Sequence, residues 1–280
     1  MLVTRFAPSP TGRLHLGHAF SAAIGHRAAR SAGGRFLLRI EDLDPARSHP
    51  EFIAGIEQDL HWLGIDWDAP PIVQSARSSI YAAPLERLRE QGLVYPCFCT
   101  RSDIAAAHHA PHEPLATYPG TCRGLPDQAA RRASSPHSWR LDATAALALT
   151  GLPGWREGNR DFHSTRDDFD DVILARKDAP AAYHLACVVD DGASAVSLVV
   201  RGADLRASTP VQRLLQLLLG LPEPGYLHHA LVTHADGRRL AKRDRSPTLQ
   251  SLRESGIDGS QLRKNLAMRQ LPGDFRLMDA

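Results

Sequence analysis

Two histidines three residues apart open the most informative segment of the chain. His15 and His18 enclose Gly17 and follow the turn-forming run Pro-Ser-Pro-Thr-Gly at residues 8–12. A strand-like run precedes that turn and small helix-forming residues follow it, so we expect a strand, a tight loop and a helix. A helix N-terminus presents unpaired N–H groups and attracts phosphate. The pattern predicts a nucleotide site in which both histidines face a phosphate and Gly17 admits it to the backbone.

A second run with residues suited to phosphate chemistry is the loop Asp236-Gly-Arg-Arg-Leu-Ala-Lys242-Arg243. A flexible cation beside a triphosphate can stabilise the charge that develops on departing pyrophosphate. Taken alone, such a run is more often a solvated basic loop. The histidine motif favours the catalytic interpretation, in which Lys242 contacts the leaving group.

Three cysteines lie close together in the sequence, at Cys97, Cys99 and Cys122. Clustered thiolates suit a tetrahedral zinc ion, which would brace a segment that is poor in apolar residues. Such a site needs a fourth ligand. The candidates are Tyr118 and the histidines, and chemistry alone favours a histidine; those histidines are His108, His109 and His112. The alternative is three free thiols. Cys187 lies in an apolar run and is predicted to be a core residue.

Four polar residues stand at predicted strand ends or turns: Arg5, Glu41, Tyr183 and Arg201. A site for an amino acid with an acidic side chain needs a carboxylate for the ammonium group and arginines for the carboxylates, because arginine forms bidentate pairs. This set has the required composition, although each residue by itself is more typical of a surface or salt-bridge group.

The elements that must position these residues alternate between strand-like and helical runs. Strand-like runs are expected at residues 2–6, 35–40, 168–177, 186–189, 195–201 and 226–233, and helical runs at residues 16–31, 50–63, 80–91 and 209–219. The alternation predicts an α/β fold with a Rossmann-type doubly wound parallel sheet, whose ligands bind beyond the carboxyl ends of the strands. We expect residues 1–94 and 127–245 to form the two halves of a catalytic domain, residues 95–126 a zinc-bearing insertion, and residues 246–280 a short helical segment.

The overall composition indicates an ordinary globular protein. Hydrophobic residues make up 43 % of the 280 residues, and the formal net charge of +2 is too small to indicate a nucleic-acid binder. The sequence shows no signal peptide and no run approaching the ~20 apolar residues of a membrane span. We therefore expect a cytoplasmic protein with no membrane partner, and a monomer.

Six motifs in order resemble the catalytic core of the glutamyl-tRNA synthetases, over about residues 3 to 245. They are Arg5-Phe-Ala-Pro-Ser-Pro-Thr-Gly, His15-Leu-Gly-His, Leu38-Arg-Ile-Glu-Asp-Leu-Asp44, Tyr183-His-Leu-Ala followed by Val188-Val-Asp-Asp, Val200-Arg-Gly-Ala-Asp, and Leu240-Ala-Lys242. Within this family the chain is similar to the short paralogues, which join glutamate to the queuosine base at the wobble position of tRNA(Asp). They have no anticodon-binding domain, and few residues follow Lys242 here.

The resemblance implies a role for each matching residue. Glutamate would be held by Arg5, Ser9, Glu41, Tyr183 and Arg201, and ATP, which comes with Mg²⁺, by His15, Gly17, His18 and Lys242. His15, His18 and Lys242 would be catalytic, the histidines at the α-phosphate and Lys242 at the pyrophosphate. One structural zinc per chain would be held by Cys97, Cys99, Tyr118 and Cys122. The lysine loop departs from the family pattern, with Arg239 for its first lysine and Ala241 for its serine.

The implied function is ATP-dependent activation of L-glutamate as an adenylate, followed by transfer of the glutamyl group to tRNA(Asp) that carries queuosine. One alternative is a glutamyl-tRNA synthetase that charges a tRNA 3′ end. An alternative of another class is a sensor that binds glutamate and a nucleotide without turnover. The presence of His15, His18 and Lys242 speaks against a sensor, because binding alone needs no pyrophosphate-stabilising loop.

Overall fold

The computed structural model describes residues 1–106, 118–238, 240, 247–273 and 275–278. Its first unit is the predicted strand, loop and helix, formed by β1 (Val3–Phe6) and α1 (Leu16–Ser31). The next strand, β2 (Arg35–Ile40), pairs in parallel with β1 and places Arg5 opposite Leu37. The crossover through α1 therefore brings the carboxyl ends of β1 and β2 to the same edge of the sheet.

Two sets of mainly parallel strands make up the main sheet. The first has the order β1-β2-β3, and the second has the order β7-β6-β10-β9, in which β6, β10 and β9 are parallel and β7 is antiparallel to β6. The additional strands are β3 (Ile72–Val73), β6 (Gly154–Glu157), β7 (Arg160–His163), β9 (Leu198–Gly202) and β10 (Gly225–His229). The two sets meet where Ser197 N donates to Val3 O over 3.0 Å, beside β9.

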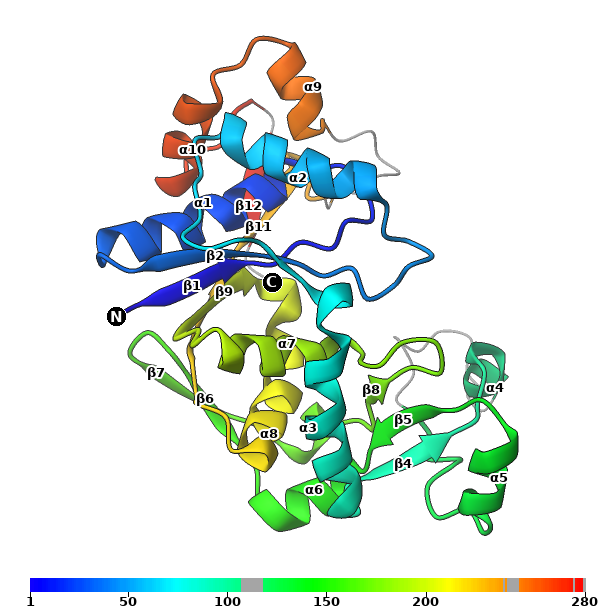
Figure 1. Cartoon of the computed structure of the whole chain (residues 1–280). Helices are drawn as coiled ribbons and strands as arrows, with labels where there is room; N and C mark the ends of the chain where they lie inside the picture. Colours follow the sequence, from blue (N-terminus) through cyan, green and yellow to red (C-terminus); the bar gives the residue numbers. More distant parts are fainter. Residues whose placement is uncertain (107–117, 239, 241–246, 274, 279–280) are drawn as a thin grey trace.

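Helices cover both faces of this sheet, as expected for a doubly wound fold. Figure 1 shows α1, α2, α9 and α10 above β1 and β2, and α3, α7 and α8 below them. These helices are α2 (Pro50–Trp62), α3 (Ser78–Glu90), α7 (Tyr183–Ala193), α8 (Thr209–Leu219), α9 (Leu249–Glu254) and α10 (Gly259–Ala267). Each group buries its own apolar cluster, one around Phe20 and Leu38 and the other around Tyr81 and Leu185.

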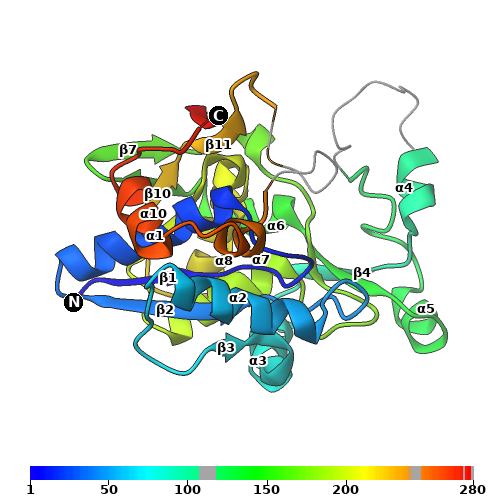
Figure 2. The ribbon, with the colours of Figure 1, turned by 90° about the horizontal axis from the view of Figure 1, so that it is seen from above.

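A separate antiparallel sheet carries the cysteine-rich segment. Its strands are β4 (Val94–Cys97), β5 (Ser138–Leu141) and β8 (Ile173–Ala175), in the order β4-β5-β8. The nearby helices are α4 (Arg101–Ala106), α5 (Gln128–Ser134) and α6 (Ala143–Thr150). Seen from above, β4, α4 and α5 extend to the side of the molecule opposite α10 (Figure 2).

The remaining elements are short. Three are 3-10 turns, at η1 (Gln74–Arg77), η2 (Arg166–Asp168) and η3 (Ala203–Ser208). The others are β11 (Leu231–His234) and β12 (Phe275–Met278), which pair antiparallel. In the part of the chain that the structure describes, no helix has the length and apolar character needed to cross a bilayer.

Three sequence-based expectations about strands were wrong. Residues 186–189 belong to helix α7, in which every residue from 185 to 191 is buried. A short apolar run fits a buried helix as well as a buried strand, so periodicity could not separate them. Of residues 168–177 only β8 is a strand, and it lies outside the parallel sheet. The expected strand at 226–233 is broken at Ala230 into β10 and β11, which belong to different sheets.

Candidate active site and metal centre

A cavity of about 460 Å³ opens at the carboxyl ends of β1, β2 and β9. All the residues predicted to bind glutamate or ATP within the described chain line it: Arg5, Ser9, His15, Gly17, His18, Glu41, Tyr183 and Arg201. Lys242, Arg239 and Ala241 lie outside the described residues. The parallel fold therefore gathers residues from five separate segments, because every strand that contributes ends at this edge.

The two histidines cap helix α1 in a reciprocal arrangement. His15 Nδ1 accepts a hydrogen bond from Gly17 N, and His18 Nδ1 accepts one from His15 N, each over 3.1 Å. A neutral imidazole that accepts through Nδ1 carries its proton on Nε2. The two rings, whose centroids are 3.8 Å apart, thus form a pair of N–H donors beside the positive end of the helix.

Gly17 is needed because the His15 ring lies against it. A Cβ atom at Gly17 would stand 3.1 Å from His15 Cε1 and 3.2 Å from His15 Nδ1. A side chain here would require the His15 ring to shift by a few tenths of an ångström. The approach of a nucleotide to the backbone at Gly17 stays a prediction.

A buried group of charges underlies one side of the cavity. Arg5 Nε donates to Asp191 Oδ1 over 3.0 Å, and Arg5 Nη2 donates to Asp191 Oδ2 over 3.3 Å. Arg39 Nη1 also donates to Asp191 Oδ1, while Arg39 Nη2 donates to Glu41 Oε1 over 3.0 Å. Asp191 therefore holds two guanidinium groups, one of which orients Glu41, the residue suited to an ammonium group.

The pKa values of this group reflect the competition between burial and charge. Burial by itself would raise the pKa of Asp191, but the guanidinium groups of Arg39 and Arg5 outweigh it and hold the pKa well below the usual carboxyl range. Cys187 lies between the same groups, with Sγ 3.5 Å from Arg39 Nη2. Burial and the nearby Asp191 raise the pKa of its thiol to about 11. Cys187 is thus buried, as predicted, and is a neutral thiol at physiological pH.

Arg201 is held differently, by neutral acceptors. Its Nη1 donates to Gln212 Oε1 over 2.7 Å, its Nη2 to Thr209 Oγ1 over 2.8 Å, and its Nε to His228 Nε2 over 3.1 Å. Among the described residues no carboxylate forms an ion pair with this guanidinium, although Arg201 is only 4 % exposed. A buried cation without a counterion is costly unless an anionic ligand supplies the missing charge.

Tyr183 and Ser9 complete the predicted glutamate set, and Tyr183 begins helix α7. Burial, with Cys187 and Glu41 nearby, raises the pKa of Tyr183 well above the ordinary phenol value, so the hydroxyl stays protonated. Sequence reasoning missed Arg39, Asp191, Asp204 and His229, of which the last two line the cavity. Asp204, Arg39 and Asp191 do belong to motifs quoted above, but nothing in their spacing indicated which faced the site.

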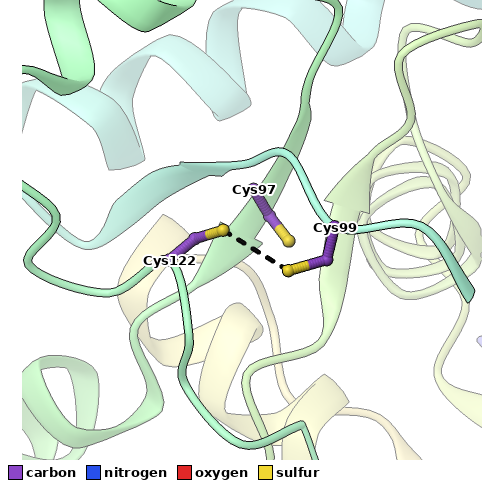
Figure 3. Close-up of side chains that lie close together, drawn as sticks. All are labelled: Cys97, Cys99 and Cys122. Carbon is purple, nitrogen blue, oxygen red and sulfur yellow. Dashed lines mark hydrogen bonds between the residues drawn. The ribbon is translucent and has the colours of Figure 1, made fainter. Parts of the chain in front are cut away.

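The three predicted cysteine ligands converge in the second sheet. Their sulfur atoms all lie within 4.8 Å of one another, with Cys99 Sγ and Cys122 Sγ 3.5 Å apart (Figure 3). Tyr118 Oη lies 3.3 Å from Cys97 Sγ and 3.5 Å from Cys99 Sγ, and it accepts a bond from Cys122 N over 3.0 Å. The donor set of three sulfurs and one phenol oxygen fits a metal ion that prefers soft ligands. His108, His109 and His112 lie outside the described residues.

Outer contacts fix the orientation of these ligands. Arg140 Nε donates to Cys97 Sγ over 3.2 Å, and its guanidinium stacks 3.7 Å from the centre of the Tyr118 ring. Tyr118 N donates to both carboxylate oxygens of Asp170 over 3.0 Å. The cluster thus has a supporting shell of the kind that metal sites in proteins require.

Comparison with known proteins agrees with this architecture. Residues 1–272 match the family described as tRNA synthetases class I (E and Q), catalytic domain. A glutamyl-Q tRNA(Asp) synthetase from Rhodobacter capsulatus is 45 % identical over 278 residues, which cover 95 % of this chain and 100 % of the relative. One from Nocardia farcinica is 47 % identical over 92 % of this chain and 81 % of the relative.

Solved structures show the same fold. The glutamate-tRNA synthetase of Elizabethkingia anophelis has a TM-score of 0.81 and 27 % identity over 95 % of this chain. A glutamate tRNA ligase from Elizabethkingia meningosepticum, solved in complex with its amino acid, gives the same TM-score and identity. This chain spans 61 % and 60 % of those two chains. From the family match and the two close relatives, the chain belongs to the class I aminoacyl-tRNA synthetases, in the glutamate and glutamine branch represented by the glutamyl-Q tRNA(Asp) synthetases.

Proposed function

We propose that the chain activates L-glutamate with Mg-ATP as glutamyl-adenylate and transfers the glutamyl group to the queuosine base of tRNA(Asp). One observation carries the activation step. A pair of imidazole N–H donors, a carboxylate and a guanidinium without a counterion line a single cavity. The acceptor is inferred from the relatives, which are named for tRNA(Asp).

In this proposal the amino acid binds across the floor of the cavity. Glu41, oriented by Arg39, receives the ammonium group. Arg5 and Arg201 receive carboxylates, and Ser9 and the protonated Tyr183 supply neutral hydrogen bonds. Each predicted glutamate residue thus has a role that suits its functional group.

The chemical step joins the two halves of the cavity. An oxygen of the glutamate α-carboxylate attacks the α-phosphorus of ATP, the bond to the bridging oxygen breaks, and pyrophosphate leaves with the bonding electrons. His15 and His18 donate through Nε2 to the α-phosphate oxygens, whose charge increases in the transition state. We assign pyrophosphate stabilisation to Lys242. The acceptor group of the tRNA then attacks the adenylate carbonyl carbon, and AMP leaves.

We further propose one structural zinc ion per chain, held by Cys97, Cys99, Cys122 and Tyr118 within the segment 95–126. Four protein ligands leave no position for a reacting water, so the ion would brace the segment. Arg253 on α9, which also pairs with Asp59 over 2.9 Å, and Arg263 on α10 would contact tRNA phosphates. The protein would act as a monomer in the cytoplasm, where tRNA and ATP occur together.

The acceptor is tested by supplying radiolabelled glutamate and ATP with three tRNA samples. These are tRNA(Asp) from cells able to make queuosine, tRNA(Asp) from cells unable to make it, and tRNA(Glu). Label is expected in the first sample alone. Label on tRNA(Glu) would instead support charging of a 3′ end, and absence of glutamate-dependent pyrophosphate exchange would support a sensor.

A further inference from the structure

The hydrogen-bond partners of Arg201 are arranged so that none of them carries a negative charge. Gln212 and Thr209 come from helix α8, and His228 comes from strand β10. Gln212 is 2 % exposed and Thr209 is fully buried. A buried arginine that is held only by an amide, a hydroxyl and an imidazole keeps its full charge, because neutral acceptors orient a cation without compensating it.

His228 is neutral in this arrangement because both of its nitrogens are committed. Nε2 accepts from Arg201 Nε, and Nδ1 lies 2.7 Å from Glu157 Oε1, to which it must donate. Burial and the charge of Arg201 lower the pKa of His228 to about 4, consistent with this assignment. Glu157 also accepts from Trp155 and Arg206. The Glu157 carboxylate is thus held one imidazole ring away from Arg201.

Two other buried arginines of this chain, unlike Arg201, are paired with carboxylates. Arg5 is paired with Asp191, on the same cavity. Arg213, the residue that follows Gln212 on α8, bonds Gln216 Oε1 over 2.6 Å and also pairs with Glu223. Arg201 differs from both, since its glutamine stands where a carboxylate would fit.

We propose that Gln212 is a specificity-determining residue, which selects an anionic side chain by leaving Arg201 without a counterion. The inference rests on the proposed activation of glutamate. Glutamate differs from glutamine by one negative charge, so a guanidinium that still needs an anion is the group able to distinguish them. Thr209 and His228 are positioning residues, because they also accept hydrogen bonds from the Arg201 guanidinium. Asp204 lines the cavity too, but it makes no ion pair with Arg201.

The deciding substitution is Gln212→Glu, which is nearly isosteric and places a carboxylate against Arg201. This substitution removes no hydrogen bond among the described residues, because Gln212 Nε2 is buried without a hydrogen-bond partner. The glutamate KM in pyrophosphate exchange should rise at least about tenfold, and the preference for glutamate over glutamine should fall by a similar factor. The ATP KM should stay within about twofold. The rise in melting temperature on adding glutamate should also shrink.

The matched control is Gln216→Glu, which adds a carboxylate to the same helix beside Arg213, outside the residues that line the cavity. It should leave both KM values and the preference unchanged. An unchanged preference in Gln212→Glu, or an equal loss in the control, would overturn the proposal. Failure of Gln212→Glu to fold would also overturn it, since a guanidinium without a counterion should accept the new carboxylate. If wild-type protein binds glutamate in the melting assay but exchanges no pyrophosphate, the proposed activation step is wrong, whereas the role of Gln212 in binding is not affected.

Discussion

Replacing Asp191 with asparagine tests the buried charge network under the cavity. The amide keeps the shape of the side chain but removes the charge that holds Arg5 and Arg39, and all three side chains are at most 5 % exposed. Arg39 would retain Glu41, whereas Arg5 would keep only neutral acceptors, among them the Val200 carbonyl and the Cys187 sulfur. Breaking a buried pair by removing one partner costs about 3–5 kcal/mol. At roughly 2–4 °C per kcal/mol for a chain of this size, the melting temperature should fall by about 6–20 °C.

Thermal unfolding at pH 7, followed by circular dichroism, measures this loss. Asp178→Asn is the control, since Asp178 pairs with Arg176 over 2.8 Å at the surface and its side chain is 52 % exposed. Exposed ion pairs contribute little, so the control should melt like the wild type. If Asp191→Asn also melted like the wild type, the network would not be the stabilising group inferred here.

The pH dependence gives an independent check of the same argument. The pKa of Asp191 is lowered in the folded protein, so its stabilisation is present above the ordinary carboxyl pKa of about 3.9 and is lost as the pH falls below it. The gap in melting temperature between wild type and Asp191→Asn should therefore be constant from pH 6 to 8. It should narrow progressively below about pH 4.

Three further predictions follow from the sites. Elemental analysis of protein purified without chelator should find one zinc per chain; Cys122→Ser should abolish it and Cys187→Ser should not. Lys242→Ala should lower the activation rate at least ~100-fold in single-turnover experiments, with little change in glutamate affinity, and an unimpaired rate would mean that this loop is only a solvated turn. Because the pKa of His228 is lowered to about 4 by burial and Arg201, the unfolded chain binds a proton that the folded chain does not between about pH 6.5 and 4. The free energy of unfolding should fall with decreasing pH in that window, by up to about 1.4 kcal/mol per pH unit from this group. Urea titrations at several pH values should show that the free energy of unfolding of His228→Asn depends less steeply on pH than that of the wild type.

Much of the site could be predicted because its signals are local. The Pro-Ser-Pro-Thr-Gly turn, the small-residue helix and the apolar run at 35–40 each specify their own conformation, and the helix bounds 16–31 agree with the expected ones. A parallel sheet then brings the ends of its strands to one edge. Arg5, His15 and Glu41 therefore had to meet there once the strand order was right.

The partners of these residues could not be predicted, because they depend on contacts between distant segments. Asp191 and Arg39 are 152 positions apart, and although each stands in a motif quoted above, nothing local indicates that they form a pair. Asp191 reaches the site only because residues 186–189 are helical, which places it four residues, about one turn, beyond Cys187 on the face that meets β1 and β2. Because residues 186–189 were expected to form a strand, the sequence could not reveal this charge network.

The sequence by itself determined the chemistry that is available: imidazoles at a helix start, thiols in a cluster and arginines at strand ends. Only the tertiary structure decided which charges are compensated. It pairs Arg5 with Asp191 and leaves Arg201 with neutral partners. It also brings Tyr118 Oη within 3.3 Å of Cys97 Sγ, whereas residue chemistry alone favoured a histidine beside the cysteines. The physical reason is that residue type sets the charge a group can carry, whereas burial and neighbours set what that charge costs and which ligand satisfies it.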